Sequence, residues 1–317
     1  MRNFLLSLAL MAIALPFTSC TDDEPVIQDE PVKETVTGKN LVSWTIKAED
    51  GTTNYVETAD YIFNIERTKD EATVSVVAKD VKFDSHMPIK VSFRMEDIKT
   101  TKFDENYVRF KASSVKFLDS ETGEENTRYT LTNVKGYVDK KNNIYSLDYT
   151  VNGTWRVLVF NSTVSTLVTD NDYSATSDLY YSYKIDVDDM KAEVFIYNVQ
   201  FQVGGATSPV LKKISIPDLD VAFTTEDYDD GPIQPVIKLT GDNIVPTYYT
   251  GANLDQGTPY PALVVNNFKS TLDISAHVHY IFFNCHGGEH SNIDNVLGSN
   301  LYLWGWDWTT NGPIKQN

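Results

Sequence analysis

The residue types best suited to bind a metal ion gather in one stretch, "SAHVHYIFFNCHGGEH", at positions 275–290. In a strand over 274–283 alternate side chains share a face, so two of its histidines would lie on one face. The other ligand types flank Gly287-Gly288 in an expected turn. Neutral imidazole and thiolate are ligands that zinc and copper prefer. The stretch is therefore a candidate site for zinc, copper or haem, with ligands drawn from His277, His279, Cys285, His286, Glu289 and His290.

Two other interpretations of this stretch stay open, because its spacing matches no established metal motif. It can be a solvated strand face followed by a polar turn, with Cys285 buried as a small apolar residue. It can also be a pH-responsive patch, since imidazoles titrate near neutrality. No cofactor is therefore predicted outright.

A second candidate surface lies near the C-terminus, where "LYLWGWDWTT" occupies positions 301–310. Four aromatic residues alternate there, so in a strand they would share one face. Flat rings bury a large apolar area and can stack on the C–H faces of sugars. The alternatives are a face that packs on the second domain and a strand that adds to another protein's sheet. The candidate platform for a glycan or a protein partner is Tyr302, Trp304, Trp306 and Trp308.

The sequence carries no catalytic signature. Nucleophile elbows, phosphate loops, zinc-protease helices and dinucleotide fingerprints are all missing. A pair of carboxylates for glycoside hydrolysis cannot be picked out of the 44 acidic residues, because the fold and not the sequence spacing sets the distance between the two groups. The chain is predicted not to be an enzyme. Its net charge of −17 also argues against nucleic acid as a partner.

The N-terminus predicts an export signal with a lipid anchor. Arg2 precedes about 13 mostly apolar residues, too few for the roughly 20 of a membrane-spanning helix. The run ends in "FTSC", which resembles a bacterial lipobox with Phe17 at the position where Leu is usual. Cys20 would then become the acylated first residue and anchor the chain to the outer membrane. The acids that follow resemble a tag for export to the cell surface.

Short alternating segments rich in Val, Ile, Thr, Tyr and Phe fill the rest of the chain, separated by turn residues. No long amphipathic helix is apparent, so the fold class is all-β. The expected organisation is a signal peptide over 1–19, an acidic tether over 20–39, and β-domains over 40–168 and 169–317. The second domain includes the aromatic C-terminal strand.

The two halves resemble each other, which predicts two tandem copies of one β-domain. Four landmarks recur at similar spacing, 118 to 125 residues. The landmark pairs are Tyr61 and Tyr183, Phe83 and Phe201, Pro88 and Pro209, and Leu147 and Leu272.

The order of these strands, with "VKF", a Met-Pro turn and "LTNVKGYVD…YSLDYTVNGTWRVLVF", resembles the calycin-like β-barrel domain of Bacteroidetes surface lipoproteins. The resemblance covers most of 55–165 and, more weakly, 175–285. It implies meandering antiparallel barrels or sandwiches at the cell surface, and it carries over no functional residues.

The expected function is therefore non-catalytic binding of a glycan, a small ligand or a partner protein by a monomeric, surface-anchored lipoprotein. One alternative is a fimbrillin-like structural subunit of a surface appendage, suggested by the length, tether and β-content. The other is a metal- or haem-capturing lipoprotein whose site is centred on residues 277–290.

Overall fold

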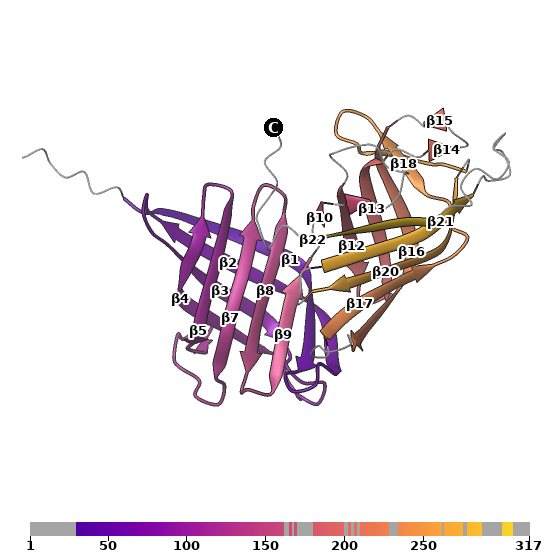
Figure 1. Ribbon diagram of the computed structural model, residues 1–317. Coiled ribbons are helices and arrows are strands. Elements are labelled where there is room, and N and C mark those ends of the chain that lie inside the picture. The colour runs from indigo at the N-terminus through magenta and orange to yellow at the C-terminus, as the bar shows by residue number, and fades with distance from the viewer. Residues whose placement is uncertain are drawn as a thin grey trace, which may run out of the picture.

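The computed structural model describes residues 30–161, 180–199, 210–227, 234–261 and 263–274, and the strand segments 165–166, 168–169, 202–203, 206–207, 278–286 and 300–306. These residues form strands and connecting loops (Figure 1) and contain no helix. None of them therefore belongs to a helix that could span a membrane. The predicted all-β fold is confirmed.

The first half of the chain is a closed, eight-stranded, antiparallel barrel, called the first barrel below. Each strand pairs with the next along the chain, and the last pairs with the first, so the barrel is an up-and-down meander. A short strand, β6 (Leu118–Asp119), pairs with β4 outside the ring. The strands of the ring are β1 (Val32–Lys47), β2 (Thr53–Arg67), β3 (Ala72–Val81), β4 (Val91–Phe103), β5 (Tyr107–Val115), β7 (Leu131–Asp139), β8 (Ile144–Val151) and β9 (Trp155–Phe160).

Side chains fill the interior of the first barrel. Along β2 the buried Tyr61, Phe63 and Ile65 alternate with more exposed residues, as a strand with one buried face requires. Aromatic rings pack at short range inside, with centroids 4.3 Å apart for Phe93 and Phe117. The interior is thus a packed hydrophobic core of this barrel.

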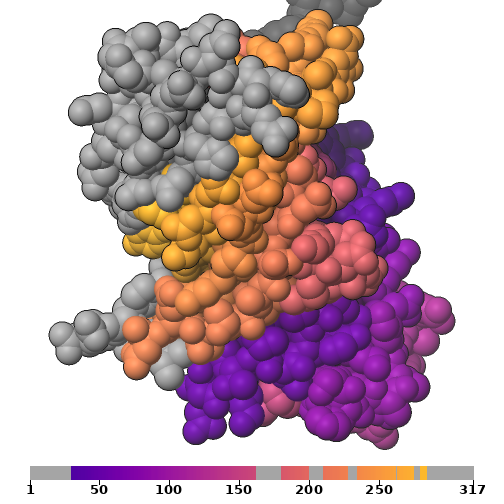
Figure 2. All heavy atoms as spheres, turned by 90° about the vertical axis from the view of Figure 1, so that its right-hand side faces the viewer, coloured from indigo at the N-terminus to yellow at the C-terminus, as the bar shows by residue number. Residues whose placement is uncertain are grey.

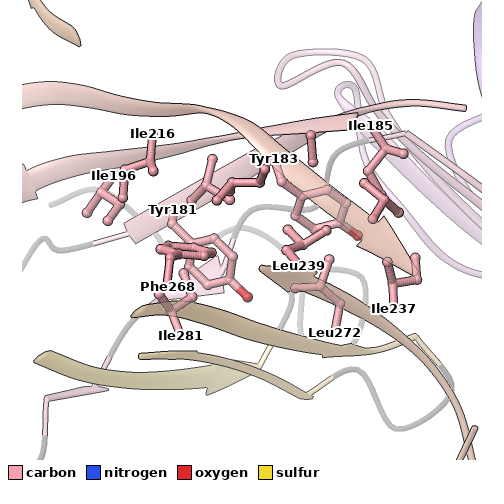
Figure 3. Packing of buried hydrophobic residues seen from close by; sticks show 14 of the residues in the cluster. Tyr181, Tyr183, Ile185, Ile196, Ile216, Ile237, Leu239, Phe268, Leu272 and Ile281 are labelled. Atoms are coloured by element: carbon pink, nitrogen blue, oxygen red, sulfur yellow. The ribbon is translucent and has the colours of Figure 1, made fainter. Parts of the chain in front are cut away.

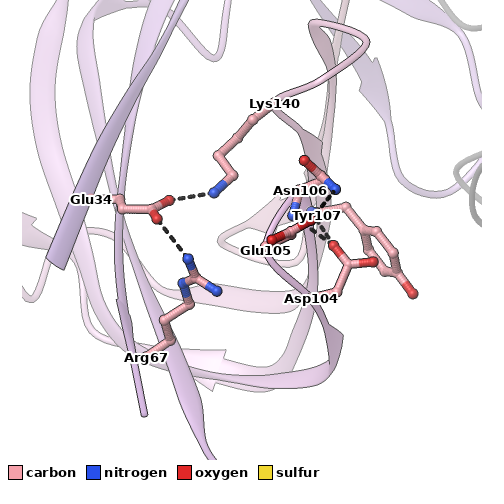
Figure 4. Close-up of polar contacts among 7 residues, drawn as sticks. All are labelled: Glu34, Arg67, Asp104, Glu105, Asn106, Tyr107 and Lys140. Carbon is pink, nitrogen blue, oxygen red and sulfur yellow. Dashed lines mark hydrogen bonds and ion pairs between the residues drawn. The ribbon is translucent and has the colours of Figure 1, made fainter. Parts of the chain in front are cut away.

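One end of the first barrel carries an ion-pair bridge (Figure 4). Glu34 on β1 accepts a hydrogen bond of 2.9 Å from Arg67 at the end of β2, and it also binds the ammonium group of Lys140. Lys140 follows β7, which is separated from β1 by two other strands of the ring. The bridge therefore ties strands from different parts of the barrel wall.

The second half forms a curled sheet, called the second sheet below, with order β10-β12-β13-β16-β17-β20-β21-β22-β11. The short β10 and β11 pair with the first and last long strands, and β18 and β19 extend one side. β14 (Gln202–Val203) and β15 (Ala206–Thr207) form a separate ladder. The bounds are β10 (Ser165–Thr166), β11 (Val168–Thr169), β12 (Tyr180–Asp186), β13 (Lys191–Val199), β16 (Leu211–Glu226), β17 (Gln234–Gly241), β18 (Thr247–Thr250), β19 (Gln256–Pro259), β20 (Val264–Asp273), β21 (Val278–His286) and β22 (Asn300–Trp306).

Strand register supports the predicted duplication. β4 bulges opposite β3 next to Asp97, and β16 bulges opposite β13 next to Asp218, 121 residues later. A second bulge contains Asn133 on β7 and recurs at Asn267 on β20, 134 residues later. All four residues have positive φ, which Asn and Asp tolerate better than most residues. Equivalent irregularities at equivalent places indicate one architecture used twice.

The register corrects two of the four landmark pairs from the sequence. Counted from the matching bulges, Ala78 on β3 is equivalent to Ile196 on β13. Tyr61 pairs with Ala78, and Tyr181 pairs with Ile196. The partner of Tyr61 in the second copy is therefore Tyr181, two residues before the predicted Tyr183. The pair of Leu147 and Leu272 is wrong, because these residues lie on β8 and β20, which are not equivalent strands. Phe201 and Pro209 lie outside the described residues.

The strand bounds also differ from the predicted domain limits. β1 begins at Val32, so residues 32–39, assigned to the tether, lie in the first barrel. β10 pairs with β12, so Ser165–Thr166, assigned to the first domain, lie in the second sheet. The sequence pattern could not separate the tether from the strand here, because the first residues of β1, "VKETVTGK", are mostly polar.

The outer face of the first barrel packs against one end of the second sheet (Figures 1 and 2). Val42, Trp44 and Ile46 of β1 belong to the same buried cluster as the interior residues of the second sheet. Figure 3 shows members of this cluster from the second sheet, such as Tyr183 and Leu239. The ring of Trp44 lies 5.2 Å from that of Phe223 near the end of β16. The first barrel thus caps the hydrophobic interior of the second sheet.

Candidate functional site: a groove at the junction

A groove of about 600 Å³ runs along the boundary between the first barrel and the outer face of β12 and β13. Its volume lies within the range of small-molecule sites. We call it the junction groove. Its polar and aromatic lining residues are Lys39, Asn40, Thr58, Asn143, Asn161, Ser182, Lys184, Asp186, Asp188, Phe195 and Tyr197.

Three asparagines of the first barrel line the groove, two at positions of positive φ and one held by hydrogen bonds. Asn40 and Asn143 have positive φ, the first at a bulge of β1 and the second in the turn between β7 and β8. Asn161 is fixed by two hydrogen bonds, since its amide accepts from Tyr145 N–H (2.9 Å) and donates to the Asn143 carbonyl (2.6 Å). Within the described part of the chain the side-chain amides of Asn40 and Asn143 make no hydrogen bond. They can therefore donate to and accept from a ligand.

Aromatic rings of the second sheet form the opposite wall. Phe195 and Tyr197 alternate with the buried Val194 and Ile196 on β13, so they lie on its outer face. Tyr197 stacks on Tyr180 with centroids 4.4 Å apart and planes 7° apart. This wall offers half-buried, apolar ring faces beside the polar asparagines.

A cation holds the aromatic wall in place. The Lys213 ammonium lies 4.8 Å from the ring centroid of Phe195, 5.9 Å from that of Tyr197 and 4.2 Å from that of Tyr249. Such contacts are worth about 0.5–1 kcal/mol each at partly exposed sites. Lys213 therefore orders three rings that come from two strands.

The tyrosines of this wall stay protonated at neutral pH. Burial raises the pKa of the Tyr197 phenol above its ordinary value, and it does the same for Tyr180. A neutral phenol keeps its O–H donor as well as its ring. The groove thus combines ring faces, hydroxyls and amides, the groups that recognise a polyhydroxylated ligand.

The predicted metal ligands are only partly described. His279 is fully buried, with its ring 5.7 Å from that of Tyr181 and 5.9 Å from that of Tyr183. It pairs with Leu272 just as Tyr145 pairs with Val138 in the first barrel, 134 residues earlier. Tyr145 is a core residue that stacks on Phe63. His279 therefore occupies a core position rather than a solvated strand face.

Within the part of the chain that it describes, the structure does not bring the other residues of that candidate site together. Cys285 and His286 lie at the end of β21, where the backbone alone is described. His277, Glu289 and His290 lie outside the described residues, as does the lipid-anchor candidate Cys20. Among the described side chains, no three His, Cys, Asp or Glu residues gather in a way that could hold a metal ion. The metal or haem site stays a prediction.

The predicted aromatic strand exists as β22, which pairs with β21 on one side and β11 on the other. Tyr302 pairs with Phe282, Trp304 with Tyr280 and Trp306 with Val278. Trp308 lies outside the described residues, as do the side chains of the other three. Because β22 is paired on both sides, its backbone at Trp304 has no open edge for strand addition.

Sequence reasoning missed the residues of the junction groove. One signal was available: "AEVFIYNV" on β13 is apolar on both faces, with Val194 and Ile196 on one and Phe195 and Tyr197 on the other. A strand apolar on both faces needs a cover or a ligand for its outer face. The asparagines gave no comparable signal, because they meet the aromatic wall only through tertiary packing.

Comparisons of the chain with protein families, with curated proteins and with solved structures find no match.

Proposed function

We propose that this protein is a non-catalytic, envelope-anchored binding protein that holds a glycan in the junction groove. The observation that carries the proposal is the pairing of the Phe195 and Tyr197 rings with the unbonded amides of Asn40 and Asn143 across one groove. Rings stack on the C–H faces of sugars, and amides bind their hydroxyls. Anchoring at the outer membrane through acylated Cys20, and a relationship to calycin-like lipoproteins, remain parts of the proposal that come from the sequence.

The packing of the first barrel favours a surface site over a ligand in the barrel interior. Small barrels can hold one ligand only when their own side chains leave room for it. Here Phe83 lies within 6.4 Å of the rings of Phe93, Phe117, Tyr129 and Tyr149, measured between ring centroids. A ligand would have to displace this aromatic core, whereas the junction groove is already open.

The test is a glycan-array screen followed by titration of the best neutral glycan, with the chain of residues 20–317 and its Phe195→Ala variant. Loss of a stacking ring worth about 1.4 kcal/mol weakens binding about tenfold. The matched control is Tyr55→Ala, because Tyr55 is also a half-buried strand residue with a lysine, Lys82, over its ring.

Binding that weakens in Phe195→Ala and not in Tyr55→Ala, with both variants folded, supports the proposal. A chain that binds no glycan, or whose two variants bind as wild type does, would refute it.

A further inference from the structure

Four cations gather on the outer face of the first barrel, away from the asparagines of the junction groove. They are Arg109 and Lys111 on β5, Lys135 on β7 and Arg156 on β9, and the acidic residue that lines the same surface is Asp148 on β8. Lys111, Lys135, Asp148 and Arg156 line an open groove of about 860 Å³. We call this the cationic groove.

The carboxylate of Asp148 is already engaged. Arg156 donates two hydrogen bonds to Asp148, of 3.0 Å from Nε and 2.7 Å from Nη2, and the Lys135 ammonium lies 3.1 Å from the same carboxylate. Asp148 is buried. A bidentate pair of this kind uses both carboxylate oxygens. The charge of Asp273 on β20 also acts on Arg156. The surplus positive charge of the groove is therefore that of Lys111.

Strand register makes this surplus costly for the barrel. Lys111 lies directly opposite Lys135 in the β5–β7 ladder, and like charges directly opposite each other destabilise a sheet. Lys111 forms no ion pair within the described part of the chain. A barrel selected for stability alone gains nothing from a lysine there, whereas an anion seated between the two lysines would remove the repulsion.

The surplus is also unusual for this chain, which has 44 acidic and 27 basic residues. A recessed positive patch on a negative molecule focuses its field at the groove and selects for anionic groups that can enter it. A flat anionic membrane surface or a nucleic acid would meet the negative charge of the rest of the molecule first. Hydroxyls of Thr132 and Thr150 lie opposite each other beside the lysines and suit a hydroxylated ligand.

We propose that the cationic groove binds an acidic polysaccharide, whose carboxylate or sulfate groups sit between Lys111 and Lys135. The choice of a saccharide rests on the proposed glycan-binding function, but the residues are separate from those of the junction groove. The junction groove would then bind the ring faces and hydroxyls of a saccharide, and the cationic groove would bind its acidic groups.

The experiment measures binding of the chain of residues 20–317 to polygalacturonate, to dextran sulfate and to neutral dextran. Variants Lys111→Gln and Lys135→Gln are compared with Lys79→Gln, which changes an exposed lysine on β3 that pairs with Asp60 and does not line the cationic groove. An exposed ion pair is worth up to about 1 kcal/mol, so each groove variant should weaken binding of the acidic polymers about fivefold. Binding should also weaken as salt rises from 0.1 M to 1 M, where the screening length falls from about 10 Å to about 3 Å.

Binding of polygalacturonate or dextran sulfate that weakens about fivefold in Lys111→Gln and is unchanged in Lys79→Gln supports the proposal and identifies the acidic group. Phe195→Ala should leave this binding intact, so failure of the junction groove would be seen separately. Equal weakening in Lys79→Gln, unchanged binding in Lys111→Gln, or no binding of either acidic polymer overturns the proposal. Binding to vesicles of anionic lipid through Lys111, without binding to the polymers, would overturn it in favour of a membrane contact.

Discussion

Replacing Trp44 by alanine should weaken the second sheet more than the barrel that contains the residue. Trp44 is fully buried, yet it points out of the first barrel, with its ring 5.2 Å from that of Phe223 on β16. Its indole N–H donates to Thr53 Oγ1 at 3.1 Å. Removing a buried tryptophan side chain costs about 3–5 kcal/mol, from lost burial and from the cavity left behind. For units of about 150 residues this corresponds to a fall in Tm of roughly 10 °C.

Hydrogen exchange followed by mass spectrometry locates the damage. In Trp44→Ala, amide exchange should rise over β16 and β17, whose ends the first barrel caps. Exchange over β3, in the wall of the first barrel away from the junction, should stay close to that of wild type, since its core consists of other residues. The pattern follows because local opening depends on the contacts that each segment buries.

The control is Trp44→Phe, which keeps a ring against Phe223 and loses the hydrogen bond to Thr53. Losing this hydrogen bond should lower the free energy of unfolding by about 1 kcal/mol, in addition to the effect of burying a smaller ring. If Trp44→Ala instead raised exchange in β3 as much as in β16, or left Tm unchanged, the capping role of the β1 outer face would be refuted.

Two further predictions concern the first barrel. A methyl group at residue 136 would lie 2.2 Å from the Phe110 ring. Gly136→Ala should therefore lower the free energy of unfolding by about 1–3 kcal/mol, measured from the midpoint of urea unfolding. An unchanged midpoint would mean that the ring moves aside without cost. The hydrogen bond from Lys140 lowers the pKa of Glu34, so the folded state gains stability above the unfolded pKa and loses it as pH falls through the folded pKa. Glu34→Gln should therefore cost about 1 kcal/mol at neutral pH, a figure reduced for solvent screening, and progressively less in acid. A cost that does not change with pH would contradict the ion-pair explanation.

Much of the fold could be predicted from local patterns. Alternation along β2 and β7, and turn residues such as Asn143 and Asn152, are local signals of strands and of the connections between them. Closure of the barrel could not be predicted in this way, because the pairing of β9 with β1 joins segments more than 100 residues apart. Local patterns carry no information about that contact.

The histidine of the candidate metal site shows a second limit. Periodicity assigns His279 to a face of its strand but does not say which face is inside. Tertiary packing decides this, and it places His279 between Tyr181 and Tyr183 in the core. The site residues Asn40 and Phe195 show the same limit, since they come from different domains and meet only at the junction.

The two halves share strand order and bulges, yet they close in different ways. In the first barrel the 16-residue β1 closes the ring along much of its length, whereas in the second sheet only the short β10 and β11 pair with the terminal strands. The apolar end of the second sheet is instead covered by Val42, Trp44 and Ile46 on the outside of the first barrel. The junction groove lies along the edge of that contact, so a ligand held there touches both copies. Because a ligand of the proposed site would bind only when the two halves are packed together, its binding would stabilise their association by mass action.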